Sequence, residues 1–233
     1  MVDAPSIGHD AERLWAEVAG EFAATQARTG LAAPSARVWQ ALREVPREYF
    51  VAAAWRDSAC DNRPLPIGHG QTISQPFIVA LMTALLDPEP EHRVLEVGTG
   101  CGYQSAVLAR LVKQVVSIER VAALSALAHE NLRRAGIHNV ALMVADGWCG
   151  APAEAPFDRI LVSAAPTEVP PALLAQLARR GRLVLPVGPR NWQHLRVIDK
   201  AADGTLHTRD VLEVSFVPMP EGLVRIDGAA ADA

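Results

Sequence analysis

The sequence has little cysteine, and its cysteines form no pattern. The chain of 233 residues has three, Cys60, Cys101 and Cys149, with no Cys-X-X-Cys pair among them. A disulfide-stabilised secreted fold uses an even set of closely spaced cysteines, and a structural zinc site uses them in pairs. The cysteine content therefore argues against both and favours a reducing compartment.

A long hydrophobic run is also absent. The apolar stretch at 77–86 (FIVALMTALL) is shorter than the roughly 18 residues that a membrane-spanning helix needs. The N-terminal region carries charged residues such as Asp10 and Arg13 where a secretory signal would need an apolar core. We therefore expect no membrane partner, a cytoplasmic protein, and a buried helix at 77–86.

Positive charge is not in excess either. The formal net charge is −4, and no basic stripe could follow a phosphate backbone. The histidines do not show the spacing of a His-Glu-X-X-His zinc motif or a similar ligand set. We therefore expect no nucleic-acid partner and no metal.

What the sequence does contain is a strand, a glycine turn, a helix and a second strand within residues 92–120. Residues 93–97 and 115–118 are mostly apolar, as strands buried on both faces of a parallel sheet are. Between them, residues 98–102 (GTGCG) predict a sharp turn, and apolar residues recur at helical spacing over 103–111. The stretch is therefore one β-α-β unit.

The glycine turn predicts a site for an adenosine-containing ligand, because glycines let a ligand approach the main chain and the next helix begins with unpaired amides. A dinucleotide-binding turn would need a glycine where Tyr103 stands. Glu96, just before the turn, would repel a pyrophosphate but suits the ammonium group of S-adenosylmethionine. We therefore predict S-adenosylmethionine as the cofactor; a turn that serves packing alone is the alternative.

Two more acids follow the ends of predicted strands. Glu119 stands where such folds place a carboxylate that accepts hydrogen bonds from both ribose hydroxyls. Asp146 could accept from the adenine amino group, unless it only forms an Asp-Gly turn with Gly147. The predicted cofactor-binding residues are Glu96, Gly98, Thr99, Gly100, Gly102, Glu119, Asp146 and Gly147.

Periodicity elsewhere predicts the remaining elements. Helices are expected over 10–28, 34–44 (with Pro34 in its first position), 45–51, 121–135 and 170–178, and strands over 140–144, 157–162, 181–188, 194–199 and 211–217. Residues 61–70, rich in proline and glycine, should form a loop. Tyr49, Phe50 and Leu127 are expected in the core.

This order of elements predicts an α/β fold: the doubly wound, Rossmann-like sheet of Class I methyltransferases, with an antiparallel edge strand and an N-terminal helical cap. We expect one structural domain overall. Within it, residues 1–75 form a helical extension and substrate loop, 76–220 bind the cofactor, and 221–233 are a flexible tail.

The residues after the strand at 157–162 bear on the methyl acceptor. Enzymes that methylate amino groups commonly have an Asp/Asn-Pro-Pro-aromatic run there, but this chain has SAAP at 163–166, and it lacks the Pro-Cys pair of a cytosine C5 enzyme. An oxygen acceptor is therefore favoured. Thr72 and Ser74 precede the helix that begins near Pro76, and spacing alone leaves open whether they cap that helix or contact a substrate.

Several separate runs resemble the protein-L-isoaspartate (D-aspartate) O-methyltransferase family. They are VPREYFV (45–51), LPIGHGQTISQP (65–76), VLEVGTGCGYQSAVLA (94–109), DGW (146–148), APFDRILVSAAPTEVP (155–170) and GRLVLPVG (181–188). The resemblance covers about residues 30–218. Cys101 departs mildly from the pattern, because many relatives have serine there.

The resemblance implies methyl transfer from S-adenosylmethionine to the α-carboxylate of isoaspartyl residues in damaged proteins or peptides, which begins repair through a succinimide. It further implies that the 72–74 segment lies over the cofactor, with Ser74 as the active-site residue and Thr72 beside it. Ile73 and His69 are then expected to contact the substrate. We expect isoaspartyl proteins or peptides as partners, and a monomer.

The implied chemistry needs alignment more than a base, because a carboxylate with a solution pKa of roughly 3.5 to 4 is already an anion at neutral pH. We therefore expect Ser74 and Thr72 to orient the acceptor by hydrogen bonds, and neighbouring residues to hold the His69 ring. Two alternatives stay open: a methyltransferase of the same fold with another protein or small-molecule carboxylate as acceptor, and a protein that binds the cofactor without catalysis.

Overall fold

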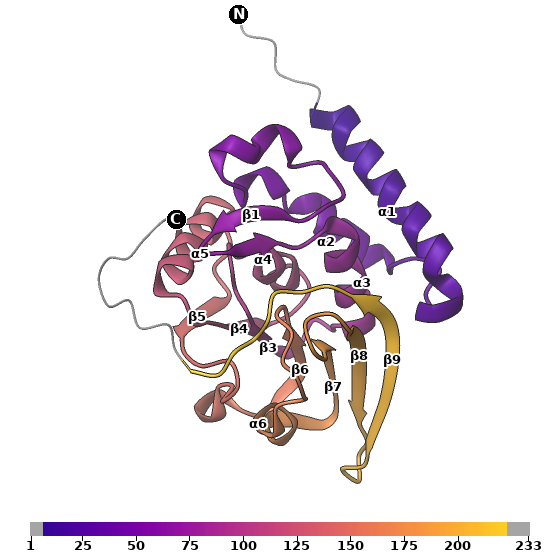
Figure 1. The fold of residues 1–233 in the computed structure, drawn as a ribbon, viewed down its shortest axis with the longest axis vertical. Coiled ribbons are helices and arrows are strands. Elements are labelled where there is room, and N and C mark those ends of the chain that lie inside the picture. The colour runs from indigo at the N-terminus through magenta and orange to yellow at the C-terminus, as the bar shows by residue number, and fades with distance from the viewer. Residues whose placement is uncertain (1–6, 223–233) are drawn as a thin grey trace, which may run out of the picture.

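The structure, a computed structural model, describes residues 7–222, so the predicted tail lies outside the described residues from 223 onward. Its centre is a seven-stranded sheet in the order β5-β4-β3-β6-β7-β8-β9 (Figure 1). The strands are β3 (Arg93–Val97), β4 (Gln114–Glu119), β5 (Val140–Val144), β6 (Phe157–Val162), β7 (Leu177–Val187), β8 (Gln193–Lys200) and β9 (Leu206–Val214).

The strands from β3 to β7 pair in parallel, whereas β8 pairs antiparallel with both β7 and β9. The chain places β4 and β5 on one side of β3, and β6 and the later strands on the other. The order in which the chain adds strands to the sheet therefore reverses at β3. Ligands of doubly wound sheets bind at such a reversal of strand order, beyond the carboxyl ends of the strands. The predicted fold class is therefore confirmed, and it fixes where a site should lie.

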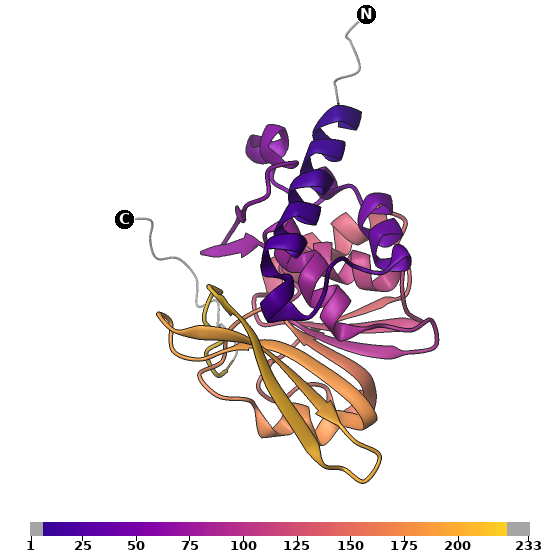
Figure 2. The same ribbon diagram turned by 90° about the vertical axis from the view of Figure 1, so that its right-hand side faces the viewer.

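Helices cover both faces of the sheet (Figure 2). One face carries α3 (Pro76–Leu86), α4 (Tyr103–Ala109) and α5 (Ala122–Arg134); the other carries α6 (Pro171–Gln176) and the short 3-10 helix η3 (Pro152–Glu154). Successive strand residues alternate between the two faces. Val94, for example, packs with the first group and Leu95 with the second, so the sheet separates two buried cores.

The N-terminal segment packs on the face that carries α3. It comprises α1 (Ile7–Thr29), α2 (Ala36–Glu44), the 3-10 helices η1 (Arg47–Tyr49) and η2 (Ala53–Ser58), and a hairpin of β1 (Leu65–Gly68) and β2 (Gln71–Ile73). The Phe22 ring of α1 lies 5.4 Å from the Phe77 ring of α3. This apolar contact attaches the predicted helical cap. None of the described helices is long and apolar enough to cross a membrane.

The predicted loop over 61–70 is wrong in part, because its second half belongs to the β1–β2 hairpin. Leu65 pairs with Ile73, and both side chains are buried. The turn holds three consecutive left-handed residues, Gly68, His69 and Gly70 (φ 90°, 53° and 66°). Glycine adopts this left-handed conformation without strain, and Gly68 and Gly70 are also the residues that favoured the prediction of a loop.

Other boundaries also differ. Helix α2 begins at Ala36 because Ser35, not Pro34, caps it: the Val38 amide donates to the Ser35 hydroxyl oxygen. The helix expected over 45–51 is the single 3-10 turn η1, and β9 ends at Val214 instead of 217. Phe50 is buried as predicted, but Tyr49 and Leu127 are 42% and 39% exposed, so both lie outside the core.

Candidate active site

A cavity of about 1470 Å³ opens at the carboxyl ends of β3, β4 and β6. The turn after β3 lines one side of it, strand β2 with the start of α3 lines another, and residues 215–220 after β9 cross over it. The structure thereby brings together residues 98–100, Glu119 and residues 72–74. These segments are distant in sequence but line the same cavity.

The turn at 98–102 follows a path that favours glycine. Gly98, Gly100 and Gly102 have φ values of 94°, 55° and 90°. The amides of Gly98 and Thr99 both donate to the Ile118 carbonyl at 2.8 and 3.2 Å, which fixes the turn against β4. A Cβ at Gly100 would lie 3.2 Å from Ile67 of β1, so the hairpin sits directly over the turn.

Gly102 packs against α5, and its predicted part in cofactor binding stays a prediction. It is not among the residues that line the cavity, and a Cβ there would lie 3.3 Å from Ala128 and Leu132 of α5. Its lack of a side chain therefore serves the packing of the turn on α5. Thr99 does line the cavity, and its hydroxyl lies 2.6 Å from that of Ser117.

Glu119 is the carboxylate best placed for a ribose. It lines the cavity at the end of β4 and is almost fully buried. Its Oε2 accepts from the Gly100 amide at 2.8 Å and its Oε1 from the Val121 amide at 2.9 Å. A carboxylate has about four acceptor sites, so capacity remains for two hydroxyl groups. The glycine turn and this acid are thus held together before any ligand binds.

Glu96 belongs to β3, one residue before the strand ends. The side chain is fully buried and lies outside the cavity lining. Its Oε2 accepts from the hydroxyls of Ser105 and Ser117, the latter at 2.7 Å, while Oε1 has no partner within the described residues. Burial raises its pKa to about 7, against the lowering effect of the two serines. Glu96 thus lies behind the residues that line the cavity, and its contact with the cofactor ammonium stays a prediction.

Both carboxylate oxygens of Asp146 accept hydrogen bonds from backbone amides. Its Oδ1 accepts from the Trp148 amide at 3.0 Å and its Oδ2 from the Gly222 amide at 2.8 Å. Asp146 does not line the cavity and holds the C-terminal segment through Gly222, and its contact with adenine stays a prediction. Gly147 does line the cavity, and a Cβ there would lie 2.4 Å from Val97.

Thr72 and Ser74 face the cavity from β2 and from the residue after it. They do not cap α3. The N-cap of that helix is Gln75, without a side-chain cap, and the Phe77 amide donates to Asn62 Oδ1 at 3.0 Å. Neither hydroxyl has a hydrogen-bond partner within residues 10–222, so both are available to a ligand.

Ile73 and His69 lie beside these hydroxyls. Both line the cavity, Ile73 buried and His69 exposed. The His69 carbonyl accepts from the Gln71 side chain, but the imidazole makes no hydrogen bond to any described residue. The expectation that neighbours hold this ring is therefore wrong. Among the described residues, no cluster of three or more His, Cys, Asp or Glu could hold a metal ion.

The segment after β9, residues 215–222, is a feature that the sequence reasoning missed, and we call it the strap. Ala165 exchanges backbone hydrogen bonds with it, donating to the Val217 carbonyl and accepting from the Met219 amide, both at 2.8 Å. Trp148 Nε1 donates to the Met219 carbonyl at 2.9 Å. Pro218 and Pro220 were the available signal, because proline is rare inside a strand.

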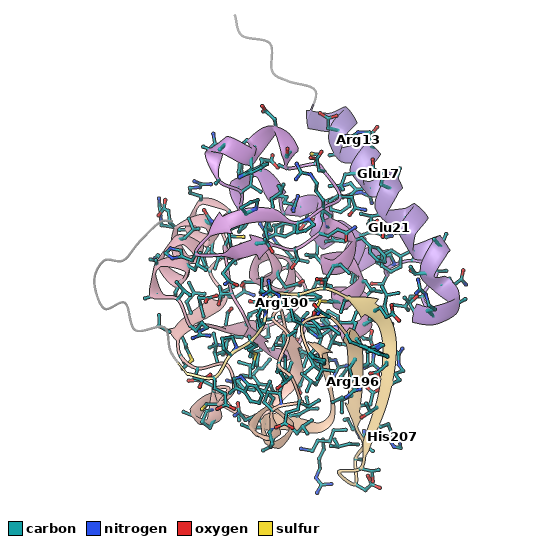
Figure 3. The ribbon with its side chains drawn as sticks, in the orientation of Figure 1. Arg13, Glu17, Glu21, Arg190, Arg196 and His207 are labelled. Carbon is teal, nitrogen blue, oxygen red and sulfur yellow. The ribbon has the colours of Figure 1, made fainter. Side chains whose placement is uncertain are left out.

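Five charged residues that line the cavity were also missed, namely Glu21, Arg28, Arg120, Arg190 and Glu213. Glu21 of α1 accepts from the side chains of Asn62 at 2.7 Å and Gln75 at 3.1 Å, and burial raises its pKa. It stands seven residues after Leu14, on the buried face of α1, so helical spacing could have identified it. Arg190, in the loop between β7 and β8, lines the cavity as well (Figure 3).

Fold and site together define a Class I methyltransferase: a doubly wound sheet with a glycine turn after its first parallel strand, and a carboxylate at the end of the next. The model of one such family, protein-L-isoaspartate(D-aspartate) O-methyltransferase (PCMT), matches residues 24–223. The chain belongs to this family.

Individual relatives agree with that membership. A protein-L-isoaspartate O-methyltransferase of Halorhodospira halophila is 54% identical over 189 residues, which cover 81% of this chain and 86% of that one. A protein-L-isoaspartate O-methyltransferase 2 of Polaromonas sp. is 49% identical over 196 residues, 84% of this chain and 93% of that one.

Solved structures resemble the fold as well. A protein-L-isoaspartate O-methyltransferase is 28% identical with a TM-score of 0.78, covering 91% of this chain and 67% of that one. A second, from Plasmodium falciparum in complex with S-adenosyl-L-homocysteine, is 25% identical with a TM-score of 0.72, covering 81% of this chain and 92% of that one.

Proposed function

We propose that this protein transfers a methyl group from S-adenosylmethionine to the α-carboxylate of L-isoaspartyl, and also D-aspartyl, residues in damaged proteins or peptides. One observation carries the proposal: a single cavity brings the glycine turn and Glu119 together with the unpaired hydroxyls of Thr72 and Ser74. Family membership and the relative bound to S-adenosylhomocysteine support the identity of the donor.

The cofactor half of the site is built from the turn and β4. The main chain at 98–100 leaves room for close approach, and Glu119 would accept from the ribose hydroxyls. When bound, the cofactor supplies an electrophilic methyl group on a sulfonium centre. The protein's task there is to hold this group facing β2 and to exclude water, which the hairpin supports by covering the turn.

The acceptor half needs no strong base, because the attacking carboxylate is already ionised at neutral pH. Ser74 and Thr72 would donate hydrogen bonds that hold its oxygen in line with the methyl group. Such alignment places the reacting atoms about 3 Å apart and can supply several kcal/mol of the barrier reduction. The ester then closes to a succinimide when the following backbone nitrogen attacks the ester carbonyl and methanol leaves.

The size of the cavity leaves room for an acceptor beside the cofactor. Its volume of about 1470 Å³ exceeds the roughly 300–1,000 Å³ typical of a pocket for one small ligand. Exposed His69 and Arg190 line it as well. A chain could therefore enter past these residues with only the isoaspartyl carboxylate reaching Ser74.

A pair of peptides tests the proposal. The protein is incubated with methyl-labelled S-adenosylmethionine and either an isoaspartyl peptide or its normal aspartyl twin, and label on the peptide is counted. We expect label on the isoaspartyl peptide alone. Transfer to both peptides, or only to a small carboxylic acid, would favour a different acceptor, and cofactor binding without transfer to any carboxylate would reject catalysis.

We also propose that residues 1–75 form the substrate side of one structural domain whose cofactor side is 76–220. The contacts of Glu21 with Asn62 and Gln75 support this, because they tie α1 to the residue after Ser74. We further propose a monomer acting in the cytoplasm. Sedimentation of the purified protein tests the first of these two statements, and fractionation of cells tests the second.

A further inference from the structure

Arg47 of η1 is a buried cation that the function described so far does not use. It is 4% exposed, and burial lowers its pKa. Its Nη1 donates to the carbonyls of Ala59 at 2.9 Å and Asp61 at 3.2 Å. Its Nη2 donates to the carbonyls of Arg63 at 2.9 Å and Ser74 at 3.1 Å. No carboxylate forms a salt bridge with it within residues 10–222.

A buried charge without an ionic partner is costly, so its hydrogen bonds must hold it in place. Arginine can do this because its planar guanidinium presents several donors in fixed directions. Here these donors join two chain segments, residues 59–63 and the residue that carries the Ser74 hydroxyl. Lysine would keep the charge, but one ammonium group cannot span four carbonyls arranged in this way.

The other end of the same short segment reaches the cofactor half of the site. Phe50, three residues after Arg47, is fully buried, and its ring lies 5.5 Å from that of Tyr103. Tyr103 is the first residue of α4, directly after the glycine turn, and it lines the cavity. Residues 47–50 therefore contact both the acceptor segment and the helix that begins at the cofactor turn.

We propose that Arg47 is a positioning residue for methyl transfer. Through the Ser74 carbonyl, Arg47 fixes the distance between the Ser74 hydroxyl and the glycine turn. This distance in turn sets the separation of the acceptor oxygen from the methyl group. This inference rests on the proposed function. It assigns Arg47 no contact with either substrate, and it separates the placement of Ser74 from the binding of the cofactor.

The test compares Arg47→Lys and Arg47→Gln with the control Arg56→Lys, which changes an exposed arginine of the neighbouring helix η2. Affinity for S-adenosylhomocysteine is measured by calorimetry, and kcat and KM with the isoaspartyl peptide. We expect both Arg47 variants to lose about tenfold or more in kcat, as misplacement of about 1 Å can cost more than that. Cofactor affinity should stay within about twofold, a difference well under 1.4 kcal/mol.

Two further measurements separate positioning from a general loss of structure. Amide hydrogen exchange should become faster at residues 59–63 and 71–75 in the Arg47 variants but not over 93–119. In a Ser74→Ala background, Arg47→Lys should reduce kcat far less than in the wild type, because its effect acts through that hydroxyl.

Wild-type kcat in either Arg47 variant that folds, or equal effects of Arg47→Lys with and without Ser74, would overturn the inference. If neither variant yields folded protein, Phe50→Leu replaces them, because it loosens the segment 47–50 that carries Arg47. The inference then requires a lowered kcat with Ser74 present and a much smaller loss in the Ser74→Ala background, and equal losses in both would overturn it. A wild-type protein that fails to methylate the isoaspartyl peptide would instead count against the proposed function.

Discussion

The main chain of Ser74 is held by a hydrogen bond, and its side chain faces the cavity. Its carbonyl accepts from Arg47, whereas its hydroxyl has no partner within the described residues. A donor that is already aimed at the acceptor need not reorganise during the reaction, which is the condition for effective alignment. The residue thus combines a rigid position with a free hydrogen-bond donor.

Replacing Ser74 by Ala should lower kcat with the isoaspartyl peptide by about 10- to 100-fold, because one orienting hydrogen bond is lost. Affinity for S-adenosylhomocysteine should change by less than about twofold, since the turn and Glu119 are untouched. Steady-state kinetics and calorimetry give the two values, and Thr208→Ala on the exposed part of β9 is the control. Weakened cofactor binding with unchanged turnover would reject the role of Ser74.

Glu119→Gln should have the opposite pattern. The amide NH₂ would face either the Gly100 or the Val121 amide, so one donor loses its acceptor and the turn loosens. Affinity for S-adenosylhomocysteine should fall by about tenfold or more, with the loss carried by KM for the cofactor. Calorimetry checks this, and an affinity equal to that of the wild type would show that Glu119 does not bind the ribose.

The buried Glu96 predicts a pH-dependent stability. Its pKa of about 7 in the folded protein lies above the ordinary value near 4.5, so the unfolded chain releases this proton first as the pH rises. The stabilising contribution is therefore present below pH 4.5 and lost as the pH passes 7, by about 3 kcal/mol.

Glu96→Gln removes this titration, so the free energy of unfolding of the variant should gain on that of the wild type between pH 5 and pH 8. Urea unfolding of the cofactor-free proteins at both pH values measures the difference. Parallel pH profiles of the two proteins would contradict a raised pKa at Glu96.

These residues also show what a sequence can and cannot indicate about side chains. The glycine turn and Glu119 were predictable because they follow directly from where two strands end. Glu96 and Asp146 stand at similarly suggestive positions, yet their carboxylates are taken up by Ser105 and Ser117, and by the strap. The spacing of residues predicts where the backbone of an acidic residue lies, but it does not show which donors hydrogen-bond to the carboxylate.

At the scale of elements, the strap is the part of the structure that encloses the site. It crosses the ends of several strands and bonds to Ala165, Trp148 and Asp146. Its backbone pairs with no regular strand beyond an isolated bridge at Ala165 and Pro218. The side chains of Gln193 and Arg120 add hydrogen bonds to Phe216 and Pro220. Side chains therefore hold much of the strap, and the loss of one such bond should shorten the time for which the cofactor stays bound.

Trp148→Phe tests this by removing the Nε1 donor to the Met219 carbonyl while keeping an aromatic ring. A hydrogen bond contributes about 1 kcal/mol, so S-adenosylhomocysteine should dissociate about fivefold faster. Stopped-flow displacement measures the dissociation rate. The control is Trp15→Phe, which changes a tryptophan of α1 that does not line the cavity. An unchanged rate would mean that the strap does not retain the cofactor.

Elements were predicted well where local and long-range signals agree. Strands β3, β4 and β6 followed from apolar runs because the sheet buries them on both faces. Strand β1 falls within the predicted loop over 61–70, because the prolines and glycines around its four residues indicate a turn. The strap has no periodicity, and only its tertiary partners define it.

On the scale of the whole molecule, the active site exists only because the fold brings distant segments together. Residues 72–74 come from the N-terminal hairpin, 98–119 from the central unit and 215–220 from the C-terminal strap. The reversal of strand order between the parallel strands β3 and β6 opens the space in which they meet. Donor and acceptor are thereby held by different parts of the chain.

A crystal structure with S-adenosylhomocysteine and an isoaspartyl peptide bound together tests this account most directly. We predict the sulfur beside the 98–100 turn, the ribose on Glu119, and the peptide α-carboxylate hydrogen-bonded to the Ser74 hydroxyl. One of its oxygens should point at the sulfur, with room between them for a methyl carbon about 3 Å from the oxygen. A peptide bound elsewhere, or a carboxylate turned away from the sulfur, would contradict the account.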